Sequence, residues 1–105
     1  MSLKVLIDPR AEQDILSIYD YYENIQDSLG ERFYSEFMDI VHLLEFYPEM
    51  YSLRSNYKCR VGVIRTFPYL LFYFISEDKV IFTAVFSSYQ SPKLLKSEVK
   101  RRTFL

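Results

Sequence analysis

The sequence predicts an α+β fold in which a helical hairpin packs on one face of a small, mainly antiparallel sheet, with the element order β-α-α-β-β-β. Two amphipathic segments fill most of the first half of the 105-residue chain. Three apolar runs follow in the second half, separated by short polar segments. Half of all residues are hydrophobic, which is enough for one globular core, so we expect residues 1–105 to form a single domain.

The first helix has a well-defined predicted start. Residues 3–7 read as a short strand, and Asp8-Pro9 follows it directly. An Asp side chain at this position accepts a hydrogen bond from a free helix amide, and proline at the first helical position lacks the amide that would stay unpaired. Apolar residues then recur at helical spacing and predict a helix over residues 9–25. They are Ala11, Ile15, Ile18, Tyr19, Tyr22 and Ile25.

A second amphipathic helix is predicted to begin at Ser28. Ser28 and Glu31 match the capping-box pattern S-x-x-E, and the helix should end near Tyr47-Pro48 because proline cannot continue a helix interior. Its apolar stripe consists of Phe33, Phe37, Ile40, Val41 and Leu44. About three residues join the two helices, so they should pack as an antiparallel hairpin.

The remaining elements are predicted strands. Residues 49–58 read as a loop and residues 58–64 as a strand. Residues 67–86 read FPYLLFYFISEDKVIFTAVF, and the charges in the middle exclude a membrane-spanning helix. Their β-branched and aromatic residues instead predict a hairpin of strands over 67–75 and 79–87. Three consecutive strands with short connections favour an antiparallel meander.

Both faces of the strand over 67–75 are apolar. Side chains alternate between the two faces of a strand. One face therefore carries Phe67, Tyr69, Leu71, Tyr73 and Ile75, and the other carries Leu70, Phe72 and Phe74. Two helices can cover only one of these faces. We expect the second face to be partly open to solvent unless the C-terminal tail or another protein lies on it.

The charges are segregated along the chain. Residues 1–50 contain eleven acids and three bases, a net charge of −8, and residues 51–105 contain ten bases and three acids, a net charge of +7. This pattern indicates either a partner that meets one half of the molecule or neutralisation across the fold. Residues 91–105 form a basic tail with Lys93, Lys96, Lys100, Arg101 and Arg102. A short helix there could dock its apolar side on the sheet, or its bases could contact nucleic acid, although a pI near 5.8 argues against a dedicated nucleic-acid binder.

The compartment predicted from the sequence is the cytoplasm. The first ten residues, MSLKVLIDPR, lack the pattern of a signal peptide. The single cysteine, Cys59, cannot form an internal disulfide, which fits a reducing environment.

The chain resembles the RelE/ParE superfamily, toxins of bacterial type II toxin–antitoxin modules, over residues 3–92. The resemblance rests on the order of elements, the L-x-x-x-P pattern at Leu44–Pro48, and the segments YKCRVGVIRTFPYLLFYFI and VIFTAVFSSYQSPK. Arg60 aligns with an arginine often found in the family's second strand. Tyr73 aligns with the tyrosine of its third strand, in the pattern that runs here from Pro68-Tyr69 to Tyr73.

The resemblance implies a small toxin that a cognate antitoxin neutralises. ParE-like members are described as inhibiting DNA gyrase, and RelE-like members cleave messenger RNA on the ribosome. Family antitoxins wrap over the toxin's sheet, which would cover the open aromatic face. The expected antitoxin-binding or partner-binding residues are Tyr69, Tyr73, Lys93, Lys96, Lys100, Arg101 and Arg102. We expect no membrane partner, no small-molecule cofactor and no metal.

The sequence departs from the RelE-like nuclease pattern. Tyr69 and Leu70 stand where such enzymes place arginine in the third strand, and neither histidine nor arginine ends the last strand. The remaining catalytic candidates for RNA cleavage are Lys58, Arg60, Arg65 and Tyr89. The alternatives are that Arg60 pairs with a helix acid such as Glu45 or Glu49 and that Lys58 is a solvated edge residue. The prediction is a ParE-like toxin that binds a protein target; RNA cleavage, or a decayed homologue without toxicity, are the alternatives.

Overall fold

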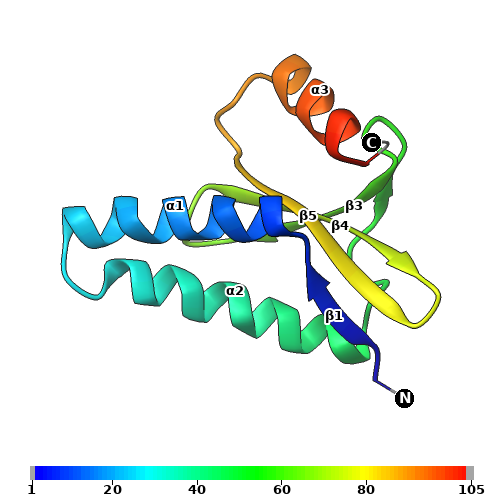
Figure 1. Ribbon diagram of the computed structural model, residues 1–105, viewed down its shortest axis with the longest axis horizontal. Helices are drawn as coiled ribbons and strands as arrows, with labels where there is room; N and C mark the ends of the chain where they lie inside the picture. The colour runs from blue at the N-terminus through cyan, green and yellow to red at the C-terminus, as the bar shows by residue number, and fades with distance from the viewer. Residues whose placement is uncertain (1, 104–105) are drawn as a thin grey trace.

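The computed structural model describes residues 2–103 and contains one five-stranded sheet with the strand order β1-β5-β4-β3-β2 (Figure 1). The elements are β1 (Lys4–Ile7), α1 (Pro9–Ile25), α2 (Leu29–Phe46), β2 (Leu53–Arg54), β3 (Cys59–Ile64), β4 (Tyr69–Ser76), β5 (Lys79–Ser87) and α3 (Pro92–Thr103). β1 is parallel to β5, and the other neighbours are antiparallel.

The predicted α+β class is confirmed. The predicted order lacked two elements, since β2 lies in the predicted loop and α3 forms the tail. No helix within residues 2–103 is long and apolar enough to cross a bilayer.

The cap predicted for the first helix is present in the structure, and the cap predicted for the second helix is not. Asp8 caps α1 as predicted, and its Oδ1 accepts a hydrogen bond from the Arg10 amide at 2.8 Å. The capping box predicted for Ser28 is wrong. Ser28 has a φ of 71° and its side chain caps nothing. Glu23 replaces it, because its carboxylate accepts hydrogen bonds from the amides of Ser28 (3.1 Å) and Glu31 (3.2 Å).

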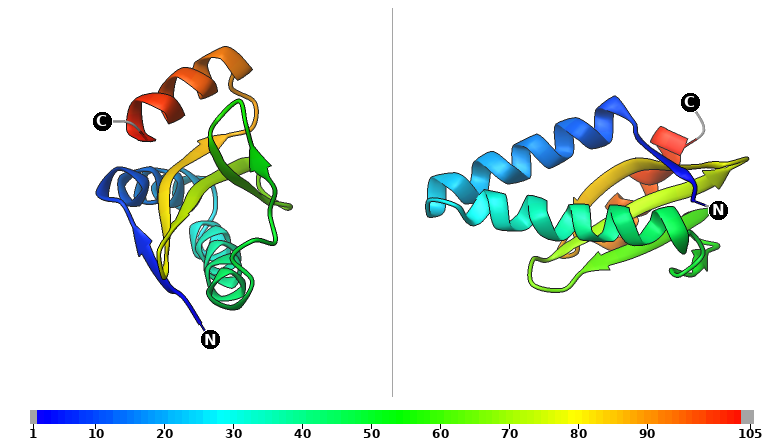
Figure 2. Two further views of the ribbon diagram at one scale, coloured as in Figure 1. Left: turned by 90° about the vertical axis from the view of Figure 1, so that its right-hand side faces the viewer. Right: turned by 90° about the horizontal axis from the view of Figure 1, so that it is seen from below.

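The helical hairpin closes tightly at Gly30. A Cβ atom at this position would lie 2.5 Å from the Tyr19 carbonyl oxygen and 2.7 Å from Cγ of Glu23. Glycine therefore sets how closely the start of α2 approaches α1. The two helices run side by side along one face of the sheet (Figure 2).

The core beneath these helices contains the face of β4 that the alternation predicted. Tyr69, Leu71, Tyr73 and Ile75 all pack there. Tyr73 is fully buried, and its hydroxyl donates a hydrogen bond to the Pro48 carbonyl at 2.8 Å. That contact ties the end of α2 to the middle of the sheet. Burial raises the pKa of Tyr73 to about 12, so its hydroxyl keeps its proton and donates.

The opposite face of the sheet is covered by α3, which lies on the side of the strands away from α2 (Figures 1 and 2). Leu95 and Val99 of α3 are buried in a second cluster with Phe72 of β4 and Ala84 of β5. Leu70, Phe74 and Phe86 remain partly exposed at its margin. The sequence predicted an open aromatic face unless the C-terminal tail or another protein lay on it. The chain's own tail is the covering that the structure shows over most of this face.

An ion pair fastens α3 to the rest of the fold. The register between β4 and β5 is irregular at Thr83, and the Thr83 carbonyl accepts a hydrogen bond from Arg102 at 3.1 Å. The same guanidinium contacts both carboxylate oxygens of Asp14 on α1, at 2.7 and 3.2 Å. Asp14 in turn accepts a hydrogen bond from the Val85 amide at 3.0 Å. The pair thus joins α1, β5 and α3 at one point.

Candidate functional site

The four candidates for RNA cleavage lie at two ends of the sheet. Lys58 and Arg60 flank the start of β3, and Arg65 follows its end. Arg60 pairs with Tyr73, whereas Ile64 pairs with Tyr69, which in turn pairs with Ser87 near Tyr89. Arg65 is five positions beyond Arg60 along extended chain, a distance of about 16 Å. The structure therefore divides the set into two pairs and brings no single acid–base site together from the four residues.

Arg60 has a defined structural partner. Its guanidinium donates to the backbone carbonyl of Tyr51 at 2.7 Å and, more weakly, to that of Glu49 at 3.5 Å. These bonds hold the segment between α2 and β2 against the sheet. The alternative predicted for Arg60 was a pair with an acid such as Glu45 or Glu49. Arg60 does contact Glu49, but both of its acceptors are backbone oxygens and not carboxylates.

The predicted partner-binding residues separate into buried and exposed groups. Tyr73 lies in the core beneath the helices, and Tyr69 is half-buried in the same cluster. Arg102 is held by Asp14, with side chains only 12% and 16% exposed. Tyr73 and Arg102 therefore both have partners inside the fold, and their assignment as partner contacts stays a prediction. Arg101 pairs with Glu98 on the surface, and Lys93, Lys96 and Lys100 are exposed.

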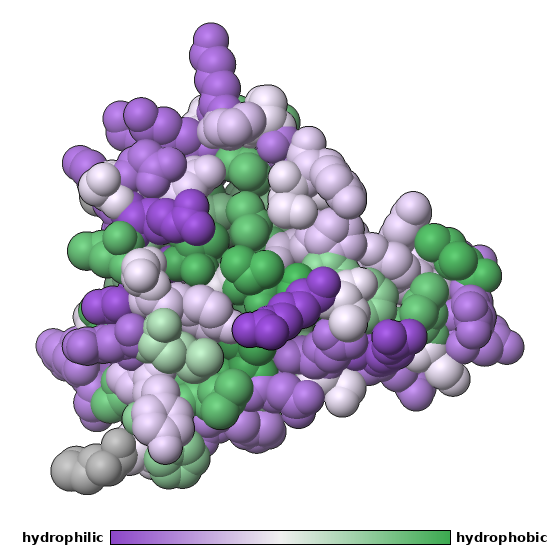
Figure 3. Space-filling view, turned by 180° about the vertical axis from the view of Figure 1, so that it is seen from behind, coloured by the Kyte–Doolittle hydropathy of each residue, from purple (hydrophilic) through white to green (hydrophobic). Residues whose placement is uncertain are grey.

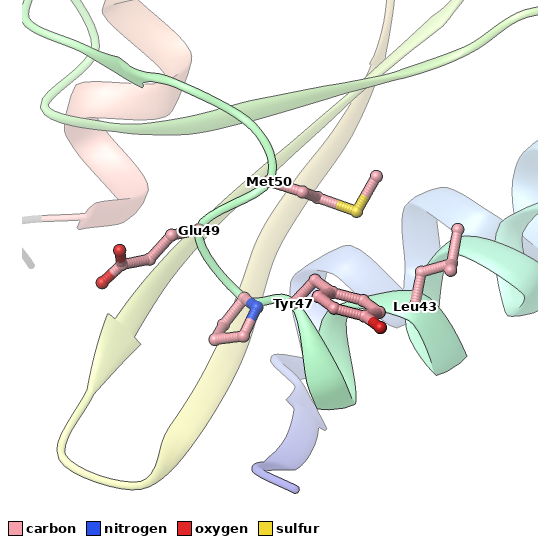
Figure 4. A pocket seen from close by; sticks show the side chains of 5 residues that line it. Leu43, Tyr47, Glu49 and Met50 are labelled. Atoms are coloured by element: carbon pink, nitrogen blue, oxygen red, sulfur yellow. The ribbon is translucent and has the colours of Figure 1, made fainter.

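A different surface exposes large apolar side chains where α2 ends. We call it the α2-end surface; it consists of Leu43, Tyr47, Pro48, Met50 and Val63. Four of these side chains are between 42% and 64% exposed. Leu43, Tyr47 and Met50 lie around one hollow, and Glu49 points away from them (Figure 4). On the face that carries β3 and the loop after α2, hydrophobic side chains gather near the middle (Figure 3).

The α2-end surface is hollowed in two places. One hollow has a volume of about 520 Å³ and is lined almost entirely by apolar atoms. A second, of about 420 Å³, shares Leu43 and Met50 with the first and extends along β3. Glu36, Asp39 and Arg65 are among the residues that line it. A contiguous exposed apolar area with charged residues beside it is typical of a protein-binding surface.

The α2-end surface was not predicted from the sequence. Leu43 and Tyr47 lie beside the stripe that ends with Leu44, so the end of α2 is apolar on two sides. The apolar residues on a second side of α2 were the one sign of this surface in the sequence. The surface also needs the loop that brings Met50 close to Val63, and the spacing of residues within a helix does not predict that loop.

The strand order and the helical hairpin fit the fold of the RelE/ParE superfamily of toxins, and a family match makes the assignment. Residues 5–92 match the family described as the ParE toxin of the type II toxin–antitoxin system parDE. The chain belongs to this family, and the resemblance predicted from its sequence is confirmed.

The fold has a counterpart among solved structures. A chain of the "Chromosomal ParDE TA system from P. aeruginosa" superposes with a TM-score of 0.69 at 13% sequence identity. The match covers 82% of this chain and 96% of the other. At this identity the likeness establishes the fold alone. No curated protein sequence matches the chain.

Proposed function

We propose that this toxin acts in the cytoplasm by binding a protein target, DNA gyrase, and that its antitoxin neutralises it by occupying the α2-end surface. Membership of the ParE toxin family carries the first part of the proposal. The division of Lys58, Arg60, Arg65 and Tyr89 between two ends of the sheet supports protein binding over RNA cleavage.

The antitoxin is assigned to the α2-end surface because the sheet faces are occupied. The helical hairpin covers one face and α3 covers most of the other. The apolar hollows around Leu43 and Met50 remain accessible, and Glu36, Asp39 and Glu49 lie beside them. A helix or extended segment with apolar anchors and basic flanking residues would fit this combination of shape and charge.

The target is tested by plasmid supercoiling with purified gyrase. Micromolar toxin should inhibit supercoiling, and the product of the adjoining reading frame, as antitoxin, should restore it. Unaffected supercoiling would reject gyrase as the target. Message cleaved on the ribosome, and left uncut by Arg60→Ala, would support the nuclease alternative instead.

The antitoxin surface is tested by a matched pair of substitutions. Leu43 and Leu94 are 45% and 49% exposed, on different helices. Leu43→Gln should weaken antitoxin binding roughly tenfold, since an apolar anchor is lost. Leu94→Gln should leave the affinity unchanged in the same titration calorimetry experiment. Equal affinities for the two variants would place the antitoxin elsewhere.

A further inference from the structure

We propose that a pocket between the turn before β3 and helix α3 binds the carboxylates of an acidic segment of a protein partner. We call it the lysine pocket. It has a volume of about 190 Å³. It is lined by Ser55, Asn56, Tyr57, Lys58, Lys96 and Lys100. The inference does not depend on whether gyrase is the target.

The turn that forms one wall is fixed in place. The amides of Tyr57 and Lys58 both donate to the Arg54 carbonyl, at 3.1 and 2.7 Å. The Tyr57 ring is buried and lies edge-on to Phe72, with ring centroids 5.1 Å apart. Lys58 has a φ of 57°, in the left-handed region that residues other than glycine rarely adopt.

The opposite wall carries two lysines one helical turn apart. Lys96 and Lys100 stand on the same side of α3, four residues apart, and both are exposed. Like charges at this spacing repel each other in a helix. None of the described lining residues is acidic, and the nearby Glu98 carboxylate is paired with Arg101. An anion in the pocket would relieve this repulsion, and Ser55 and Asn56 offer additional hydrogen-bond donors.

The chemistry favours a protein carboxylate over a nucleic-acid backbone. Nucleic-acid binding relies on contacts to many successive phosphates along a basic stripe. Here three lysines surround one small pocket in a chain of net charge −1, and residues 1–50 carry a net charge of −8. The net negative charge of the chain disfavours the approach of a long polyanion. A short run of aspartate or glutamate carries less charge and can place it in the pocket.

The test is an NMR titration of the full chain with a hexaglutamate peptide, compared with a hexathymidylate. The peptide should bind saturably and shift the amide resonances of Ser55–Lys58, Lys96 and Lys100. Lys96→Gln/Lys100→Gln should weaken peptide binding by about tenfold or more, since two close charges are removed. Lys58→Asn should also weaken binding, and asparagine tolerates the left-handed backbone, so the turn is preserved.

The matched control is Lys4→Gln/Lys93→Gln. It removes the same charge from two exposed lysines outside the pocket and should leave the peptide affinity almost unchanged. Three results would overturn the proposal. They are the absence of saturable binding, an equal loss of affinity in the control, and tighter binding of hexathymidylate at the same amides. Supercoiling is not a readout here, so failure of the pocket is distinguishable from failure of the proposed gyrase target.

Discussion

At the scale of single residues, Arg102 shows how a basic side chain in a predicted tail becomes structural. Its guanidinium bonds to Asp14 and to the Thr83 carbonyl and lies 4.6 Å over the Phe86 ring. Its own carbonyl accepts a hydrogen bond from Arg10 at 2.9 Å. Four separate contacts therefore hold one residue. Its neighbour Arg101 instead makes a single exposed pair with Glu98.

Replacing these two arginines should have unequal effects on stability. Arg102→Met leaves the Asp14 carboxylate buried without its counter-ion, so the free energy of unfolding should fall by about 3 kcal/mol. Arg101→Met removes only a surface pair and should cost less than about 1 kcal/mol. Urea unfolding of both variants measures the difference. Equal losses would mean that the ion pair with Asp14 does not anchor α3.

Asp8 should make the stability dependent on pH in acid. The side-chain hydrogen bond from Arg10 is the main reason that the pKa of Asp8 is lowered. A carboxyl group with a lowered folded-state pKa stabilises the fold above its unfolded pKa, near 4, and that contribution is lost as the pH falls through the folded value. Asp8→Asn retains a capping side chain but has no such titration.

The stability of the wild type should therefore fall more steeply below about pH 4 than that of Asp8→Asn. Urea unfolding at several pH values between about 2 and 6 provides the comparison. Parallel curves for the two proteins would contradict the role of Asp8.

At the scale of secondary-structure elements, α3 is the covering of one sheet face. Leu95 is 3% exposed and Leu94, its neighbour in sequence, is 49% exposed. Leu95→Ala should lower the free energy of unfolding by about 2–4 kcal/mol because it opens a cavity above Phe72 and Ala84. Leu94→Ala should change it by no more than about 0.5 kcal/mol. Thermal or urea unfolding checks the pair, and similar values would show that α3 is not docked as described.

The start of α2 offers a second comparison between elements. The Glu23 carboxylate on α1 accepts hydrogen bonds from two amides at the start of α2, a role that the sequence pattern assigned to Ser28. Glu23→Ala should therefore cost about 1 kcal/mol, similar to the loss of a helix cap. Ser28→Ala should stay within about 0.5 kcal/mol of the wild type in chemical unfolding. A larger loss of stability in Ser28→Ala than in Glu23→Ala would support the capping box instead.

Across the whole molecule, the features that could be predicted from the sequence are those that depend on residues close together in the chain. The bounds of α1 followed from Asp8-Pro9 and one continuous stripe, and the alternation in β4 assigned its side chains to the correct faces. β2 was missed because two residues are too few to show any periodicity. The docking of α3 could not be decided because Arg102 is recognisable as an anchor only when Asp14, 88 residues away in sequence, is placed beside it.

The candidate site was predicted less well than the fold for the same reason. Tyr73 was identified through the family pattern, but its burial depends on how α2 ends over the sheet at Pro48. The α2-end surface combines side chains from a helix, a loop and a strand, and no single stretch of sequence contains it. The lysine pocket likewise joins a turn to a helix about forty residues further along the chain.

Hydrogen–deuterium exchange of the toxin, alone and with its antitoxin, tests most directly where the antitoxin binds. We expect new protection in the segment from Leu43 to Leu53 and beside Val63, where the apolar hollows lie. Exchange in this segment that is unchanged by a stoichiometric antitoxin, with new protection appearing elsewhere in the chain, would contradict it.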